Sequence, residues 1–296
     1  MNKTLTMTAV FQANSLNYGE GVANISELKK MHRDNGEVYT FASRQSIRYD
    51  IVRLGNELFG WNLNTVEKLS GNVVQFRKDV TIDDSVEMDL FGYLKTDKVS
   101  QKRPAAARLS HSVSLEPYKS DLEFLNNMGM AARIGQTPNL ANIEQHQSFY
   151  TYTMTVDLHR VGIDEGITLP NEERAKRVVQ LLEILKVLNR DIRGRRENLS
   201  PLFVVGGVYD FSNPLFLGMI QLSKNSKGWS IRPEPIASAA SASFLGHPVK
   251  EQTRVGVVHG FWDNEKELLQ AFGEQLVSVD AFFSHLQDAV HTYYGA

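Results

Sequence analysis

The alternation of apolar and polar side chains predicts most of the strands. In residues 4–11, Leu5, Met7, Ala9 and Phe11 face one way and the threonines face the other, as in a half-buried strand. Residues 149–158 alternate in the same way, with an apolar face of Tyr150, Tyr152, Met154, Val156 and Leu158. Residues 202–208 are continuously apolar, as in a central strand. Shorter patterns predict strands at 86–94, 215–222 and 253–258.

Apolar positions spaced three and four apart predict three helical regions. Residues 43–59 begin at Ser43, a favoured N-cap residue, and carry one apolar face made of Ile47, Ile51, Leu54 and Leu58. Residues 172–193 have the most regular stripe, formed by Val178, Leu181, Leu182, Leu185 and Leu188. Residues 264–293 are predicted to be helical with a break near Ser278.

The order of these elements predicts an α+β fold. Strand, helix, strand, insertion, strand, helix and strand follow one another, which is the split β-α-β arrangement of an RRM-like (ferredoxin-like) sheet. Residues 95–147 are irregular and contain three prolines, so we expect an insertion of loops and short helices. Residues 224–252 are rich in Ser, Ala, Gly and Pro and are predicted to form a protruding hairpin or loop.

Composition narrows the possible functions. The 296 residues are 42% hydrophobic, enough for one elaborated domain or two small ones. The absence of Cys excludes disulfides, thiolate catalysis and Cys-ligated zinc. No apolar run reaches about 20 residues, and the first residues lack the apolar block of a signal peptide. We therefore expect a soluble, cytoplasmic protein without a membrane partner.

Charge is segregated along the chain although the net charge is only −2. Residues 174–196 and 95–108 are basic, whereas residues 79–90 and 263–296 are acidic. Such segregation allows a basic groove on a nearly neutral protein. The alternative is that these segments are ordinary solvated faces.

The polar stretch from residue 14 to residue 50 carries the chemistry that suits a phosphate-rich ligand. Amide, hydroxyl and glycine residues follow the first strand, and Arg44 and Arg48 share one face at the start of the predicted helix. The candidate binding residues in this stretch are Asn14, Ser15, Asn17, Tyr18, Asn24, Ser43, Arg44, Gln45 and Arg48. The alternatives are a plain turn and a capped helix whose arginines pair with acids such as Asp50.

Three motifs resemble the DevR family: SLNYGEGVANISELKK, SRQSIRYD and, more weakly, DLFGY at residues 89–93. Proteins of this family are the repeated backbone subunits of type I CRISPR surveillance complexes (Cascade), and this chain is most similar to the type I-B branch. The resemblance implies a hand-like fold. Its RRM-like palm would comprise residues 1–59, 148–223 and 253–296. Residues 60–147 would be the fingers, including the palm strand 86–94, and residues 224–252 the thumb hairpin.

The resemblance also implies the function. Several copies would polymerise as a helical filament along one CRISPR guide RNA (crRNA), forming a ribonucleoprotein of antiviral defence without a catalytic role. The partners would be the guide, target DNA through the guide, further copies and other Cascade subunits. Additional contacts are expected from basic and aromatic residues of the fingers and thumb: Lys102, Arg103, Arg108, Lys227, Trp229 and Arg232. Trp229, Phe244 or Leu245 would be the wedge that displaces a base. DLFGY is expected to do structural work, with Gly92 allowing a close approach.

No catalytic or metal-binding motif is present, and no cofactor is predicted. The chain lacks Walker A, HExxH and G-x-S-x-G patterns as well as the aromatic signature of RNA-binding RRM strands. Two alternatives remain open. One is an RRM-fold endoribonuclease that processes guide precursors with His32 or His111 as general base. The other is an α+β protein that forms oligomers without RNA.

Overall fold

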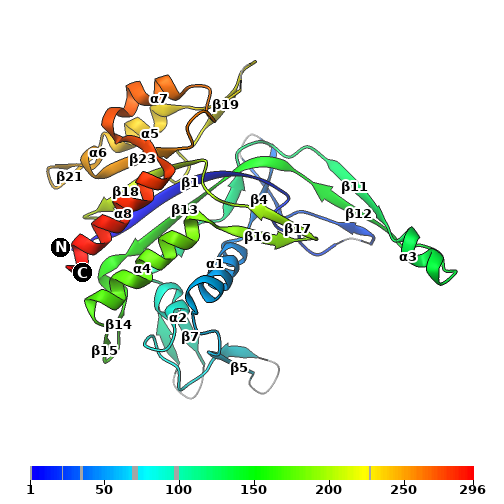
Figure 1. The fold of residues 1–296 in the computed structure, drawn as a ribbon, viewed down its shortest axis with the longest axis horizontal. Coiled ribbons are helices and arrows are strands. Elements are labelled where there is room, and N and C mark those ends of the chain that lie inside the picture. The colour runs from blue at the N-terminus through cyan, green and yellow to red at the C-terminus, as the bar shows by residue number, and fades with distance from the viewer. Residues whose placement is uncertain (1, 22, 34–35, 69–72, 97–99, 227) are drawn as a thin grey trace.

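A computed structural model describes residues 2–21, 23–33, 36–68, 73–96, 100–226 and 228–296, and it is organised around one long sheet (Figure 1). The spatial order is β24-β23-β18-β1-β13-β10-β4-β3, and β9 also pairs with β13. In that order the strands are β24 (Leu276–Ser278), β23 (Thr253–Val257), β18 (Phe203–Tyr209), β1 (Thr4–Asn14), β13 (Gln147–Asp157), β10 (Ser112–Ser114), β4 (Val38–Ala42) and β3 (Lys30–His32), with β9 at Ala107–Leu109. The strands predicted at 4–11, 149–158, 202–208 and 253–258 are confirmed.

Strand β1 lies at the centre of the sheet and is buried on both faces. It pairs antiparallel with β13 from Thr4↔Asp157 to Asn14↔Gln147, and antiparallel with β18 on its other side. The prediction of a half-buried strand was therefore wrong. The threonine face is covered as well, and its hydroxyls find partners there: Thr4 donates to Asp157, Thr6 donates to the carbonyl group of Asn213, and Thr8 Oγ1 lies 2.7 Å from Thr153 Oγ1 of β13.

Three helices cover one face of the sheet: α1 (Arg44–Phe59), α4 (Asn171–Lys186) and α8 (Val279–Tyr294). Ser43 is the N-cap of α1 as predicted, and its side chain accepts from Ser46 N. The helix predicted to reach residue 193 ends at Lys186, and a hairpin of β16 (Asn189–Ile192) and β17 (Arg195–Asn198) follows. The break near Ser278 is confirmed, because Ser278 caps α8 after the short strand β24.

The opposite face is covered by residues 210–226, 228–252 and 258–275, which precede and follow β23 along the chain. The elements there are β19 (Leu222–Lys224), β20 (Trp229–Ile231), α5 (Pro233–Ala240), β21 (Ser243–Phe244), β22 (His247–Pro248), α6 (Val249–Gln252), α7 (Glu265–Phe272) and η3 (Gly273–Gln275). The strand predicted at 215–222 is absent from these described residues except for Leu222, where β19 begins. The protruding hairpin or loop predicted at 224–252 is also wrong, since Ile231, Ile236 and Val249 are buried in the second hydrophobic cluster. Two short hairpins flank a packed helix instead.

A small lobe follows α1. It contains the hairpins β5 (Val66–Lys68)–β6 (Val74–Phe76) and β7 (Tyr93–Lys95)–β8 (Gln101–Arg103), with α2 (Val86–Phe91) between them. Nearby are the turn η2 (Leu158–Arg160) and the hairpin β14 (Ile163–Asp164)–β15 (Ile167–Thr168). The palm strand predicted at 86–94 is thus a helix, and β7 pairs with β8 rather than with the main sheet. Ser85 caps α2 by accepting from Met88 N.

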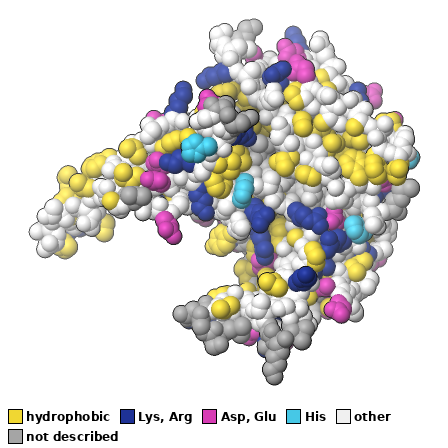
Figure 2. Space-filling model, turned by 180° about the vertical axis from the view of Figure 1, so that it is seen from behind, with side chains coloured by type: hydrophobic (Ala, Val, Ile, Leu, Met, Phe, Trp, Pro, Cys, Tyr) yellow, Lys and Arg dark blue, Asp and Glu magenta, His cyan; other side chains and the backbone are white. Residues whose placement is uncertain are grey.

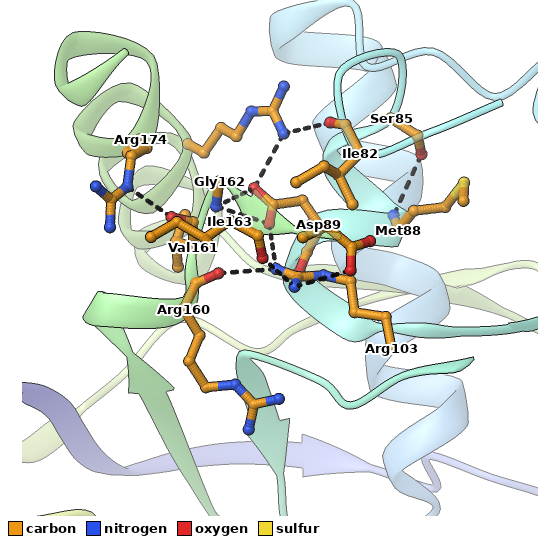
Figure 3. Close-up of polar contacts among 12 residues, drawn as sticks. Ile82, Ser85, Met88, Asp89, Arg103, Arg160, Val161, Gly162, Ile163 and Arg174 are labelled. Atoms are coloured by element: carbon orange, nitrogen blue, oxygen red, sulfur yellow. Dashed lines mark hydrogen bonds and ion pairs between the residues drawn. The ribbon is translucent and has the colours of Figure 1, made fainter. Parts of the chain in front are cut away.

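Asp89 of the DLFGY motif joins this lobe to the body of the protein (Figure 3). Its fully buried carboxylate lies 2.6 Å from Arg103 Nη2 and 2.9 Å from Arg177 Nη1, and both guanidinium groups are nearly buried. The backbone N–H of Gly162 donates to the same carboxylate. Gly92 has φ +71°, and a Cβ there would meet Arg103 O at 2.4 Å, so the expected close approach is present.

A long arm projects away from the sheet (Figure 1). It consists of β11 (Asp121–Asn126), α3 (Met128–Arg133) and β12 (Leu140–Gln145), and β12 also pairs with β2 (Ile25–Ser26). Seven large apolar side chains of the arm are exposed: Leu122, Phe124, Leu125, Met128, Met130, Ile134 and Leu140. The insertion predicted at 60–147 therefore contains a lobe, two strands of the main sheet and this arm.

Candidate nucleic-acid interface

Hydrogen bonds at the start of α1 bring three distant segments together. Asn17 Oδ1 accepts from the backbone N–H of Ser43 at 3.1 Å, so the polar loop after β1 is attached to the helix start. His111 Nδ1 accepts from the backbone N–H of Arg44 at 3.1 Å, which adds the turn between β9 and β10. The predicted residues Asn17, Ser43 and Arg44 thus lie side by side, where the N-terminus of a 16-residue helix favours an anion.

A cavity of about 380 Å³ lies beside this helix start, and we call it the α1 pocket. It is lined by Arg44, Gln45, Arg48, Phe91, Ala105, Ala107, Arg108 and Leu109. Four of the predicted RNA-binding residues therefore share one pocket. Figure 2 shows Lys and Arg side chains gathered at the centre of one face, in the hollow between the arm and the small lobe at the bottom of the view.

The charges of the α1 pocket are only partly compensated. Arg48 Nη2 lies 2.6 Å from Glu87 Oε1, and Arg108 Nη1 lies 2.8 Å from Asp157 Oδ2. Burial alone would raise the pKa of Asp157, but hydrogen bonds from Ser212, Arg108 and Thr4 lower it below its usual value. In the described part of the chain, Arg44 has no ion-pair partner. Two carboxylates against three guanidinium groups leave the pocket positive, as a phosphate site requires.

The loop after β1 runs from the α1 pocket to the base of the arm. The hydroxyl of Tyr18 donates to Glu144 O at 3.0 Å, and the guanidinium of Arg193 lies 4.9 Å from the centre of the Tyr18 ring. Asn24 is exposed, and its backbone carbonyl accepts from Asn142 N of the arm. The backbone N–H of Asn14 donates to Glu197 Oε2. The contacts of Asn14, Tyr18 and Asn24 therefore link this loop to the hairpin β16–β17 and to the arm.

Two predicted RNA-binding residues are corrected by the structure. Ser15 is fully buried, and its hydroxyl donates to Gln145 Oε1 at 2.9 Å, so it holds the fold together. Arg103 is 6% exposed and is held by Asp89 and by the carbonyl groups of Arg160 and Ile163. Neither side chain faces solvent, and sequence patterns could not reveal these partners because they are distant along the chain.

The remaining predicted residues lie away from the α1 pocket. Lys102 of β8 lines a separate cavity of about 630 Å³ in the small lobe. Trp229 packs against Phe149 on the opposite face of the sheet, and the exposed Arg232 pairs with Glu234 at 3.6 Å. Lys227 lies outside the described residues. Among the three predicted wedge residues, Leu245 is the most exposed, at 76%.

Sequence patterns gave no role to Glu144, which anchors the arm. Its carboxylate accepts from Leu28 N at 2.7 Å and from Lys30 Nζ at 2.8 Å. Burial alone would raise its pKa, but the hydrogen bonds from Lys30 and Leu28 lower the pKa below the usual 4.5.

This lowered pKa predicts a pH-dependent arm. A carboxylate with a depressed folded-state pKa stabilises the fold above its unfolded pKa, and this contribution is lost as the pH falls through the folded value. We expect amide hydrogen exchange in residues 140–145, corrected for intrinsic rates, to accelerate below about pH 4.5. In Glu144→Gln this acceleration should be absent and exchange should be faster already at pH 7. Identical pH profiles for the two proteins would contradict the assignment.

Comparisons with known proteins assign the chain to a family. A family model described as "CRISPR-associated negative auto-regulator DevR/Csa2" matches residues 5–226. The chain belongs to the DevR/Csa2 family. The predicted family is thus confirmed, although no curated protein sequence matches the chain.

Solved structures show that this family member shares its fold with CRISPR complex chains. One match is a chain of a "CRISPR RNA-guided surveillance complex, pre-nicking", with a TM-score of 0.63 and 14% identity over 97% of this chain and 100% of that one. Another is a chain of a "CRISPR RNA-guided surveillance complex", with a TM-score of 0.56 and 16% identity over 98% and 99% of the two chains. The predicted α+β fold is confirmed at this level.

Among the described residues, no group of three or more His, Asp or Glu side chains is arranged to hold a metal ion. None of the helices in the described part of the chain is both long enough and apolar enough to cross a membrane.

Proposed function

We propose that this DevR/Csa2 protein is a non-catalytic backbone subunit of a type I, I-B-like, Cascade complex that binds the guide RNA. The observation that carries the proposal is the arginine-lined α1 pocket at a helix start, in a chain of a CRISPR-associated family. Guanidinium groups near the positive end of a helix bind phosphate whatever the base attached to it. The protein would therefore hold the guide backbone and leave its bases free to pair with target DNA, as in other guided effectors.

We interpret the centre of the sheet as an RRM-like palm. The order β18-β1-β13-β9, antiparallel throughout, and the packing of α1 and α4 on one face support this interpretation. The arm at 121–145 is a better candidate for the thumb than residues 224–252, because it projects farthest from the body (Figure 1). Residues 124–142 carry a single charge, on Arg133, so this surface suits apolar contacts with bases or with a neighbouring copy.

Polymerisation along the guide follows from the same arrangement. A filament needs a heterologous interface, in which different surfaces of successive copies meet. The arm supplies one such surface, and the acidic and basic segments of the chain add complementary charge. Cytoplasmic location and association with other Cascade subunits belong to the same proposal.

The proposal is tested by binding of purified protein to fluorescent guide RNAs that differ only in spacer sequence. Affinities should agree within about threefold between spacers, because phosphate contacts carry no sequence information. They should fall steeply with salt because bound counterions are released. Affinity that depends strongly on spacer sequence, or that is insensitive to salt, would exclude binding through the guide backbone.

The position of His111 beside Arg44 favours a second candidate function, cleavage of guide precursors. The tautomer weighs against it. Because Nδ1 of His111 accepts from a backbone N–H, the neutral ring carries its proton on Nε2, where it can donate but not act as a base. His32 is no close partner, because β4 lies between the two strands. His32 pairs with Val38 at one end of β4, whereas Ser112, next to His111, pairs with Ala42 at the other end. RNA cleavage that is lost in His32→Ala/His111→Ala, with binding retained, would establish the nuclease instead.

A further inference from the structure

The arm is attached to the body of the protein with little apolar packing. No residue from 121 to 145 belongs to any of the three hydrophobic clusters of the fold, and of its apolar side chains only Ala131 and Ile143 are buried. Its two strands pair with each other, and among the described residues β12 otherwise pairs only with β2, at Asn142↔Ile25 and Ile143↔Ser26. Because apolar packing normally fixes how one element sits on another, we expect the direction of this arm to depend largely on polar contacts at its base.

Those contacts come from two sides. On one side Glu144 is held by the backbone N–H of Leu28, at the end of the loop after β1, and by Lys30 of β3. On the other side lies the hairpin β16–β17, whose Arg195 donates from Nη1 to Gln145 Oε1 at 3.2 Å and lies 4.0 Å from Glu123 Oε2. Arg195 therefore contacts both strands of the arm, since Gln145 is on β12 and Glu123 is on β11.

The same hairpin also holds the polar loop. Arg193, at the tip of the hairpin, donates to Ser26 Oγ at 3.0 Å and lies over the ring of Tyr18. Glu197 accepts from the backbone N–H of Asn14 at 2.9 Å and lies 3.3 Å from Arg195 Nε. One short hairpin thus connects the end of β1, the polar loop and the base of the arm.

We propose that the hairpin β16–β17 is a brace, and that Arg195 is the positioning residue that fixes the arm relative to the polar loop. The effect of this brace on the assembly of successive copies rests on the proposed function. If the arm contacts the next copy, its fixed direction makes assembly of successive copies cooperative. A guanidinium suits this role because Nη1 faces the arm while Nε lies near Glu197 of its own hairpin, whereas a lysine ammonium is a single point charge.

The matched control is Arg196, the next residue on the same strand. It is exposed, and its guanidinium pairs with Asp191 of its own hairpin at 2.8 Å. Arg195→Ala and Arg196→Ala therefore remove the same charge from the same strand, but only the first removes a contact to the arm. Arg195→Lys keeps the charge without the fork.

The experiment compares the three variants with the wild type on two RNAs, one too short for two copies and one long enough for several. We expect Arg195→Ala to bind the short RNA like Arg196→Ala but to lose about tenfold in cooperative assembly on the long RNA. Arg195→Lys should recover only part of that loss. Equal cooperativity in Arg195→Ala and Arg196→Ala would overturn the brace, and so would an equal loss on both RNAs, which would make Arg195 a direct RNA contact.

Hydrogen exchange without RNA separates this inference from the proposed function. Exchange in residues 121–126 and 140–145 should be faster in Arg195→Ala than in Arg196→Ala, because the arm loses its support. If the wild type bound no RNA, the proposed function would fail, and the exchange result alone would decide whether Arg195 holds the arm. Unchanged exchange in the arm would overturn the brace in either case.

Discussion

Replacing Asp89 with Asn should lower the free energy of unfolding by about 3–5 kcal/mol, because it removes the buried carboxylate that two buried arginines share. Asp89 is fully buried between Arg103 and Arg177, which are 4% and 3% exposed at their side chains. Asn keeps the size of the side chain but carries no charge, and it cannot reproduce the ion pairs. The measurement is equilibrium unfolding in urea, with the midpoint lowered and the slope unchanged.

Asp83→Asn is the control for this substitution. Asp83 belongs to the same acidic segment, but it is exposed, so its replacement should change stability by no more than about 0.5 kcal/mol. If the free energies of unfolding of Asp89→Asn and Asp83→Asn differed by less than about 1 kcal/mol, the buried ion pairs would not hold the lobe to the body.

Replacing Arg44 and Arg108 together with Ala should weaken binding to single-stranded guide RNA by at least about tenfold, because each arginine neutralises a phosphate. Both side chains line the α1 pocket, and Arg44 lies on the first turn of α1. If both contacts are made, the slope of log affinity against log salt should fall by about 1.4, since each phosphate contact with a single strand contributes roughly 0.7. The measurement is fluorescence anisotropy over a series of salt concentrations.

Lys266→Ala is the control for charge alone. Lys266 is an exposed residue of α7, which packs in the second hydrophobic cluster away from α1. Its loss should leave both affinity and salt slope unchanged. An unchanged salt slope in Arg44→Ala/Arg108→Ala would show that the RNA does not occupy the α1 pocket.

The central strands were predictable from sequence because their side-chain pattern reports local geometry directly. Residues 4–11 and 149–158 alternate with period two, and both form long strands of the main sheet. Residues 86–91, Val-Glu-Met-Asp-Leu-Phe, alternate too, yet they form a helix. The local signal that distinguishes them is Ser85 followed by Glu87 and Asp89, an N-cap with acidic residues in the first turn.

The candidate site was predictable only in part, because burial and ion pairing depend on residues far apart in sequence. Arg44, Gln45, Arg48 and Arg108 share the α1 pocket, although Arg108 comes from a different element than the others. Arg103 looks equally basic in sequence, but Asp89 and Arg160 surround it in the fold. The hairpin after α4 was missed because the polar residues 189–198 have no apolar stripe. Its local signal is Gly194, because glycine readily adopts the positive φ that a two-residue hairpin turn requires; in the structure both Arg193 and Gly194 have positive φ.

The most direct test of the central claim is nuclease protection of a co-purified guide. The protein would be expressed with a CRISPR guide precursor and the other subunits of its complex, purified, and treated with RNase. If the protein is a backbone subunit that repeats along the guide, RNase treatment should leave a large particle in which RNA is protected at regular spacing. An RNA-free protein, or bound RNA that RNase removes completely, would contradict the account.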